Sequence, residues 1–336
     1  MKRAAWITGI VIVILFGGYL LGPKFDEPDY SAELPHLQLN IENVAQYVSD
    51  KEAAYNIRPD NEARIVWFND SLKNQTEYCL LYLHGFSASW YEGNPTHINV
   101  AAKLKVNLFL SRLHAHGLTQ RDAFAEMKPD ELYLSAQEAL LIASALGKKV
   151  IIIGTSTGGT LALKLAADYP EMVDALILLS PNIEINNPAA FLFAGPWGLN
   201  LVKKVGGGGM YRNLGPGIDI ENKYWYREYR WEGVIYLQQL IETTMNEKVF
   251  IKVKSPVFVG YYYKDEENQD RTVKVDAILD MFDKLGTPEN SKHKVAFPNA
   301  NSHVIGCADL SGCAPEVESE IMNFIHKIVL KDKWNN

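Results

Sequence analysis

The stretch VIIIGTSTGGTLALKLAADY, residues 150–169, decides the fold. Its first four residues form an apolar run typical of a buried strand, and the part from Leu161 onward has the pattern of a helix. Between them, Gly154-Thr155-Ser156-Thr157-Gly158 matches G-x-S-x-G at the turn from strand to helix. Such a sharp turn needs small residues on both sides of its apex. The stretch therefore predicts that Ser156 is exposed at the carboxyl edge of a sheet, where open α/β folds bind ligands.

This turn has more than one interpretation. It could be a glycine-rich turn without chemistry, but a phosphate loop would need G-x-x-x-x-G-K, which is absent. The interpretation that we prefer makes Ser156 a nucleophile. The Thr157 amide would then stand at a helix N-terminus, where it can donate to an oxyanion.

Seven short apolar runs alternate with helical patterns after residue 60. They are RIVWF (64–68), CLLYL (79–83), VNLFL (106–110), VIIIG (150–154), ALILL (175–179), PVFVGYYY (256–263) and KVAF (294–297). Runs that are apolar on both faces suit a mostly parallel sheet covered by helices on both sides. The alternation predicts an α/β fold with right-handed crossovers.

One segment, residues 183–250, interrupts this alternation and predicts a cap inserted after the strand near residue 179. Its run of four glycines, 206–209, would suit a hinge or only a loose loop. Its aromatic cluster would line an acyl pocket, meet a membrane surface or simply pack a lid helix. The cluster consists of Tyr224, Trp225, Tyr226, Tyr229 and Trp231, with Arg227 and Arg230 between them.

A nucleophilic serine needs a base, and the base needs an acid that orients it. His303 is the candidate base, because it follows the strand KVAF late in the chain, where the order Ser, acid, His would have it. Two aspartates follow the preceding strand. We predict Asp270 as the acid because it leads directly into a helical pattern, and Asp265 remains the alternative.

The sequence H-G-F, residues 84–86, follows the strand CLLYL and offers a second oxyanion donor, the Phe86 amide. His84 is predicted to hold this loop by a hydrogen bond. Together with His114 and His116 it could instead suggest a metal site, but no further ligand follows at close spacing. We therefore predict no metal.

Taken together, H-G-F, G-T-S-T-G-G, the acid and the late histidine resemble the α/β-hydrolase superfamily over about residues 60–330. Within it, the chain is similar to the serine aminopeptidase S33 and monoacylglycerol lipase group. That group has P-G-H-G where this chain has His114-Ala115-His116-Gly117. The resemblance implies a covalent acyl-enzyme on Ser156, with His303 as base, Asp270 as orienting acid, and no cofactor.

We therefore expect a serine hydrolase that cleaves small or lipid-like carboxylic esters. The same triad could serve a peptidase or amidase. The alternative that is not an enzyme is a membrane-tethered binding module that keeps the hydrolase fold without catalysis.

The 336 residues carry a net charge of -7, which offers no basic surface for nucleic acid. Residues 1–23 begin with Lys2 and Arg3, continue with an uncharged apolar stretch and end at Pro23. They predict an uncleaved membrane anchor, or alternatively a signal segment. The positive-inside rule then places the rest of the chain outside the cytoplasm, in the periplasm if the source is bacterial.

Residues 24–60 are expected to form a linker and a helix, either as a stalk or packed on the hydrolase domain of residues 61–336. Near the end of that domain, Cys307 and Cys313 could pair in an oxidising compartment or stay free. Cys79 falls in an apolar run and is expected to be a buried thiol. The sequence leaves the oligomeric state open.

Overall fold

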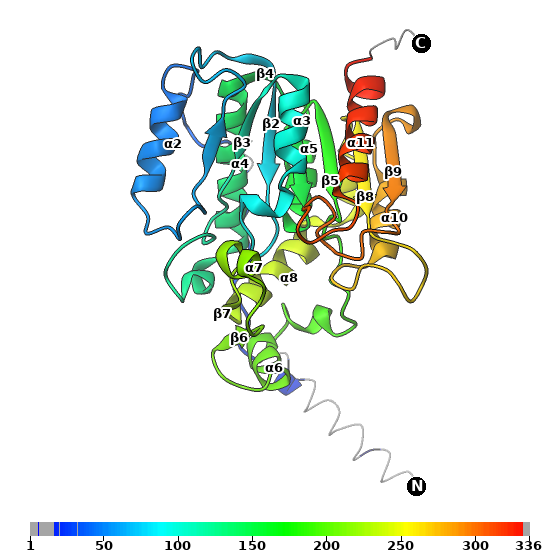
Figure 1. Cartoon of the computed structure of the whole chain (residues 1–336). Coiled ribbons are helices and arrows are strands. Elements are labelled where there is room, and N and C mark those ends of the chain that lie inside the picture. Colours follow the sequence, from blue (N-terminus) through cyan, green and yellow to red (C-terminus); the bar gives the residue numbers. More distant parts are fainter. Residues whose placement is uncertain (1–5, 7–16, 20, 32, 332–336) are drawn as a thin grey trace.

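The computed structural model describes residues 6, 17–19, 21–31 and 33–331, and its centre is a seven-stranded sheet in the order β1-β3-β2-β4-β5-β8-β9 (Figure 1). The strands are β1 (Arg64–Val66), β2 (Thr76–Leu83), β3 (Asn107–Leu110), β4 (Gly147–Thr155), β5 (Ala175–Leu179), β8 (Val257–Tyr261) and β9 (Lys292–Ala296). All neighbours pair in parallel except β1, which runs antiparallel to β3. The mostly parallel sheet predicted from the sequence is therefore confirmed.

Helices cover both faces of the sheet. One face packs against α2 (Val44–Ala53), α4 (Pro129–Leu146), α5 (Thr157–Asp168) and α10 (Val275–Lys284). The other packs against α3 (Thr96–Leu104) and α11 (Ala314–Phe324). Side chains of β2 alternate accordingly, because Leu81 and Leu83 lie in the first core and Leu80 and Tyr82 lie in the second.

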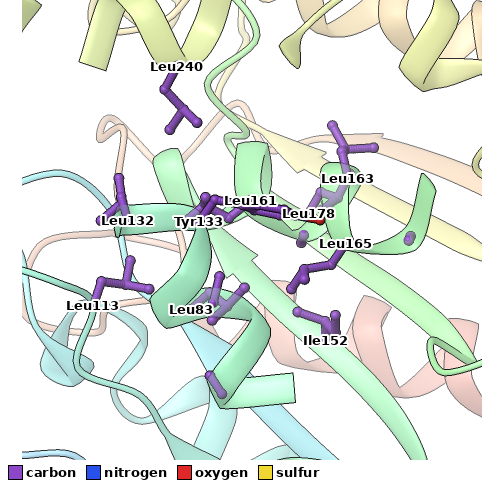
Figure 2. Packing of buried hydrophobic residues seen from close by; sticks show 14 of the residues in the cluster. Leu83, Leu113, Leu132, Tyr133, Ile152, Leu161, Leu163, Leu165, Leu178 and Leu240 are labelled. Atoms are coloured by element: carbon purple, nitrogen blue, oxygen red, sulfur yellow. The ribbon is translucent and has the colours of Figure 1, made fainter. Parts of the chain in front are cut away.

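The first core is a dense cluster of leucines. Leu132 and Tyr133 of α4 and Leu161 and Leu165 of α5 pack together above the sheet residue Ile152 (Figure 2). All five side chains are buried. This packing fixes α5, and with it the turn that precedes α5, against the sheet.

Residues 180–256, between β5 and β8, hold the predicted cap. Its elements are α6 (Gly198–Val205), β6 (Tyr211–Asn213), α7 (Asp219–Tyr224), β7 (Glu228–Arg230), α8 (Glu232–Thr244) and α9 (Glu247–Phe250). The first four lie together beyond the carboxyl ends of the parallel strands (Figure 1). In contrast, α8 packs against α4 and α5, and its Leu240 is buried in the first core, on the side of α4 and α5 away from Ile152 (Figure 2). The predicted insertion is therefore only partly separate from the main domain.

The segment before β1 packs on the main domain and is not a free stalk. Val44 and Val48 of α2 are buried in the first core. Glu52 forms a buried ion pair with Arg112, whose Nε lies 2.8 Å from the carboxylate. The helix expected within residues 24–60 is therefore α2, and it packs on the main domain.

Most of the predicted anchor, residues 1–23, lies outside the described residues. In the part that is described, no helix is both long enough and apolar enough to cross a bilayer. The last residue of this segment, Pro23, contacts the cap, since the Trp197 amide donates to the Pro23 carbonyl at 2.8 Å.

Two further features complete the fold. The thiols of Cys79, Cys307 and Cys313 are all free and buried, so the alternative of a bond between the last two is not realised in this structure. At one edge of the sheet, β9 is largely exposed and carries Lys292 and Lys294, both of which lie over the ring of Phe282.

Candidate active site

Ser156 occupies the sharp turn between β4 and α5. Its backbone has φ of 53° and ψ of -118°, a conformation that side-chain-bearing residues rarely adopt. The turn is held by main-chain bonds, because the Ser156 amide donates to Leu179 O at 3.0 Å and the Asn182 amide donates to Ser156 O at 3.0 Å. The strained serine is therefore stabilised by the two strands and the helix that surround it.

The glycines of the motif permit this turn. A Cβ added at Gly154 would lie 2.5 Å from Gly158 O, and one added at Gly158 would lie 1.9 Å from Leu83 O. Both contacts are with backbone, which cannot move aside easily. The positions two residues before and two residues after Ser156 must therefore be glycine for the turn to pack against the end of β2, which agrees with the spacing argument from the sequence.

His303 follows β9 and binds Asp270, which follows β8. The distance from His303 Nδ1 to Asp270 Oδ2 is 2.6 Å. The other carboxylate oxygen of Asp270 accepts the amides of Thr272, at 2.8 Å, and Val273, at 3.2 Å. The Asp270 side chain is thus buried and its two oxygens are used.

The charges of this pair support one another. Burial raises the pKa of Asp270, but His303 and the two amides lower it below its usual value. Burial lowers the pKa of His303, but Asp270 and then Glu92 raise it, and the result lies above the usual value. A carboxylate beside the ring therefore stabilises the imidazolium form.

Asp265, the alternative acid, is not near this pair. It is exposed, and its Oδ1 accepts the amides of Glu267 and Asn268 and the Asn268 side chain within its own loop. The structure therefore brings His303 to Asp270 and leaves Asp265 to cap a turn.

The H-G-F loop lies against the serine turn. A Cβ added at Gly85 would lie 3.0 Å from Ser156 Cβ, and Phe86 lines the same cavity as Ser156. Thr157 is the first residue of α5, so its amide has no acceptor within the helix. Both predicted oxyanion donors are therefore next to the nucleophile candidate.

Histidines support this loop from behind. His84 contacts Gly85 O through Nδ1, at 2.9 Å, and accepts the Leu113 amide through Nε2, at 3.1 Å. His116 accepts the Ser87 amide at 3.1 Å, and its Nδ1 contacts His114 O at 2.8 Å. Both rings are buried, and burial lowers their pKa. These contacts confirm the structural role predicted for His84.

A cavity of about 420 Å³ opens over the serine. Ser156 and His303 form part of its wall, and His303 Nε2 is buried without a hydrogen-bond partner among the described residues. The apolar lining includes Phe86, Phe193, Leu214, Trp225, Val234 and Leu237, most of which come from the cap. A volume and lining of this kind fit a small organic ligand.

The aromatic residues of the cap differ in role: some line the cavity and others only pack the fold. Trp225 and Tyr229 line the cavity. Tyr224 instead stacks on Tyr91, with ring centroids 4.2 Å apart, and Tyr226 donates to Leu118 O at 2.9 Å. Trp231 is buried in the first core. Sequence alone could not separate the pocket residues from the packing residues.

Comparisons with known proteins agree with this geometry. The family described as serine aminopeptidase, S33, matches residues 136–301, which include the serine turn, Asp270 and the strand β9. A solved chain from the metagenome-derived lipolytic enzymes LipS and LipT aligns with a TM-score of 0.64 at 17% identity, over 81% of this chain and 99% of that one. These likenesses show that the chain has the α/β-hydrolase fold.

Two further structures share the α/β-hydrolase fold. The monoacylglycerol lipase of Paleococcus ferrophilus aligns with a TM-score of 0.56 at 13% identity, over 79% of this chain and 98% of that one. Est1E of Butyrivibrio proteoclasticus, solved with ferulic acid, aligns with a TM-score of 0.53 at 16% identity, over 80% and 95%. Among curated proteins, none matches the chain.

Sequence reasoning missed one residue of this site, Glu92. Its Oε2 accepts the Gly85 amide at 2.5 Å, and the residue lines the cavity with Ser156 and His303. Burial raises the pKa of Glu92 to about 7, although the Gly85 amide, His303 and Tyr82 lower it. The residue lies seven positions after Gly85 in a short 3-10 helix, and nothing in its sequence context marks it as buried.

The described part of the chain contains no group of three or more His, Cys, Asp or Glu side chains that could hold a metal ion. His84 and His116, which suggested such a site in the sequence, are used by the loop contacts described above.

Proposed function

We propose that the chain is a serine hydrolase that cleaves carboxylic esters through an acyl-enzyme on Ser156. The observation that carries the proposal is the His303–Asp270 contact of 2.6 Å on the wall of the cavity that also contains Ser156. With Nδ1 bound to the carboxylate, His303 keeps Nε2 available as the proton acceptor. That nitrogen is buried and has no hydrogen-bond partner among the described residues.

The proposed reaction has two halves. Ser156 Oγ attacks the ester carbonyl carbon while His303 Nε2 takes its proton, and the Phe86 and Thr157 amides donate to the resulting oxyanion. The imidazolium then gives the proton to the leaving alcohol, and an ester of Ser156 remains. Water attacks this acyl-enzyme with His303 again as the base, and the carboxylic acid is released.

The apolar lining of the cavity favours a substrate with an acyl group on one side of the scissile bond. The similar structures include metagenome-derived lipolytic enzymes and a monoacylglycerol lipase, and this likeness supports lipid-like esters here as well. The same site would cleave an amide, since the acyl-enzyme is identical. A p-nitrophenyl ester and the p-nitroanilide of the same acid separate the two activities.

The first prediction tests the nucleophile. Wild-type protein is expected to react with a fluorophosphonate probe and to hydrolyse p-nitrophenyl esters of two to twelve carbons, and Ser156→Ala is expected to lose both. The loss in kcat should be on the order of 10⁶-fold, as expected when a triad serine is removed. Circular dichroism of both proteins controls for folding. Folded wild-type protein that takes up no probe would instead favour a binding module.

The proposal includes an N-terminal anchor that holds the hydrolase domain outside the cytoplasm. Its support is the apolar sequence after Lys2 and Arg3 and the acidic residues Asp26, Glu27 and Asp29 that follow it. Full-length protein should resist alkaline extraction from membranes, and a chain without residues 1–23 should not. Protease added to spheroplasts should degrade the full-length protein; protection from it would contradict the orientation.

A further inference from the structure

Two arginines lie on the wall of the candidate active-site cavity. Arg212 comes from β6 of the cap, and Arg271 follows Asp270 after β8. Arg212 is half-buried and Arg271 is exposed. The two side chains therefore reach the same cavity from different parts of the fold, one above the sheet and one at its carboxyl edge.

These two arginines differ from the others that the structure describes. Carboxylates pair with Arg64, Arg112, Arg121, Arg227 and Arg230. Arg58 donates to the Trp225 carbonyl at 2.9 Å. Among the described residues, Arg212 and Arg271 form no ion pair. Arg212 contacts Tyr229, lying over its ring with 5.9 Å between Cζ and the ring centroid and hydrogen-bonding to its side chain.

The acids near the cavity are used elsewhere. Asp270 precedes Arg271 in the chain, but its two oxygens bind His303 and the amides of Thr272 and Val273. Glu92 lines the cavity but accepts the Gly85 amide. Its raised pKa of about 7 means that it is only partly ionised near neutral pH. Positive charge on the cavity wall is therefore not balanced by a contacting carboxylate.

A third polar group, this one without a hydrogen-bond partner, lies beside the nucleophile candidate. Asn182 lines the cavity, is 3% exposed, and has a buried side-chain oxygen with no hydrogen-bond partner among the described residues. A buried amide without a partner costs free energy, so a polar ligand that bonds to it would recover that cost. Asn182 and the two arginines together give a mostly apolar cavity a polar side.

We propose that Arg212 and Arg271 bind an anionic group, a carboxylate or a phosphate, carried by the ester substrate away from its scissile carbonyl. A guanidinium fits both anions, because its planar donors can form two parallel hydrogen bonds to their oxygens. The substrate class is therefore an acyl ester with one apolar part and one anionic part. This inference rests on the proposed ester hydrolysis and specifies its substrate.

Matched esters test the preference on each side of the scissile bond. On the acyl side, 4-methylumbelliferyl hemiglutarate is compared with the pentanoate, which has the same number of acyl carbons without the charge. On the alcohol side, 1-butyrylglycerol 3-phosphate is compared with 1-butyrylglycerol. A dodecanoyl pair of the same glycerol esters distinguishes a lipid headgroup from a small soluble phosphate ester.

The wild type should prefer the charged member of at least one pair in kcat/KM. Replacing either arginine, as Arg212→Gln or Arg271→Gln, should reduce kcat/KM for that ester by about tenfold or more, since charge-assisted hydrogen bonds are the strong ones. Both variants should cleave the neutral ester within about twofold of wild type. Arg121→Gln, which removes an exposed cap-side arginine that does not line the cavity, is the control and should change neither ester.

Added salt gives an independent readout. The preference for the charged ester should fall as sodium chloride is raised, because exposed charges are screened, while the rate on the neutral ester should hold. Equal kcat/KM for the charged and neutral members of every pair, unchanged in both arginine variants, would overturn the inference.

Binding to Ser156→Ala separates this inference from the proposed function. Calorimetry with 1-dodecanoylglycerol 3-phosphate needs no turnover, and binding should weaken when Arg212→Gln or Arg271→Gln is added to that background. If wild-type protein takes up no fluorophosphonate but this binding holds, hydrolysis fails and the anion site stands. If the probe labels Ser156 but neither arginine affects binding, the anion site fails and hydrolysis stands.

Discussion

The carboxyl end of the sheet and the cap beyond it are built in different ways. At the sheet, Ser156 is fixed by main-chain hydrogen bonds to Leu179 and Asn182 and by the backbone contacts of Gly154 and Gly158. In the cap, β6 and β7 have three residues each, and Gly207, Gly208 and Gly209 follow one another with positive φ. Large apolar side chains of the cap, such as Trp197 and Met210, are exposed.

The two regions also have different proposed roles: one carries the reacting groups and the other the groups that select the substrate. The groups proposed to react are held by main-chain geometry that leaves little freedom. The groups proposed to choose the substrate, Arg212 and the apolar lining, come mostly from a region with few main-chain constraints. Helix α8 is the exception, because it lines the cavity through Val234 and Leu237 and packs into the core through Leu240. Helix α8 therefore connects the cavity wall to the core that packs on the sheet.

Among variants that leave Ser156 in place, the largest effect should come from the acid that orients His303. Asp270→Asn is expected to lower kcat by on the order of 10⁴-fold, because an amide at this position stabilises the wrong imidazole tautomer. Asp265→Asn, which removes an exposed loop carboxylate of the same type, should stay within about twofold. Steady-state hydrolysis of a p-nitrophenyl ester measures both, and the reverse ranking would refute the assignment of Asp270.

The two kinds of glycine should respond differently to the same added methyl group. Gly158→Ala places a Cβ against Leu83 O and should cost about 3 kcal/mol or more of unfolding free energy, since backbone must move. In Gly208→Ala the added methyl group meets nothing within 4 Å. Its unfolding free energy should fall by only ~1–2 kcal/mol, the cost of holding an alanine in the left-handed conformation. Urea denaturation compares them. Equal losses would mean that the cap loop is held as tightly as the serine turn.

The smallest effect should come from Glu92. Its charge raises the pKa of His303, so Glu92→Gln should lower that pKa. His303 acts as a base only when neutral, and the acid limb of the kcat/KM profile should therefore move to lower pH. The glutamine can still accept the Gly85 amide, so the rate on the plateau should change by only a few-fold. An acid limb that stays in place would show that Glu92 does not influence His303.

The stability of this variant should also depend on pH. Burial raises the pKa of Glu92 in the folded chain, so the ionised form is disfavoured there relative to the unfolded chain. Wild-type protein therefore loses stability from this group as pH rises from about 4.5 through about 7, and Glu92→Gln does not. The melting temperature of the variant relative to wild type should rise over that range.

Much of this arrangement could be predicted because it is local in sequence. The motif around Ser156 carries its own strand, glycines and helix, and the order of the strands places His303 and its acid after β9 and β8. The choice between Asp265 and Asp270 needed the structure, since both follow the same strand and only the folded loop shows which one turns inward. The antiparallel direction of β1 likewise depends on its pairing with β3 and not on its own residues.

What could not be predicted depends on contacts between distant segments. Glu92 becomes unusual only when Gly85 and His303 surround it, and the same composition in an exposed loop would leave it an ordinary carboxylate. Arg212 and Arg271 are separated by most of the cap and all of α8 and β8. Their common lack of an acidic partner is a property of the whole charge network, which no short motif records.

The edges of the sheet bear on how the protein behaves at high concentration. An exposed edge strand offers unpaired backbone groups to another chain and can start aggregation. Here β1 is only three residues long, and β9 carries Lys292 and Lys294, so a second sheet would have to bury charge to pair there. Lys292 is paired with Glu289 and Lys294 with Asp283, so another strand could pair with β9 only by disturbing or burying these ion pairs, which opposes the growth of sheets from one molecule to the next.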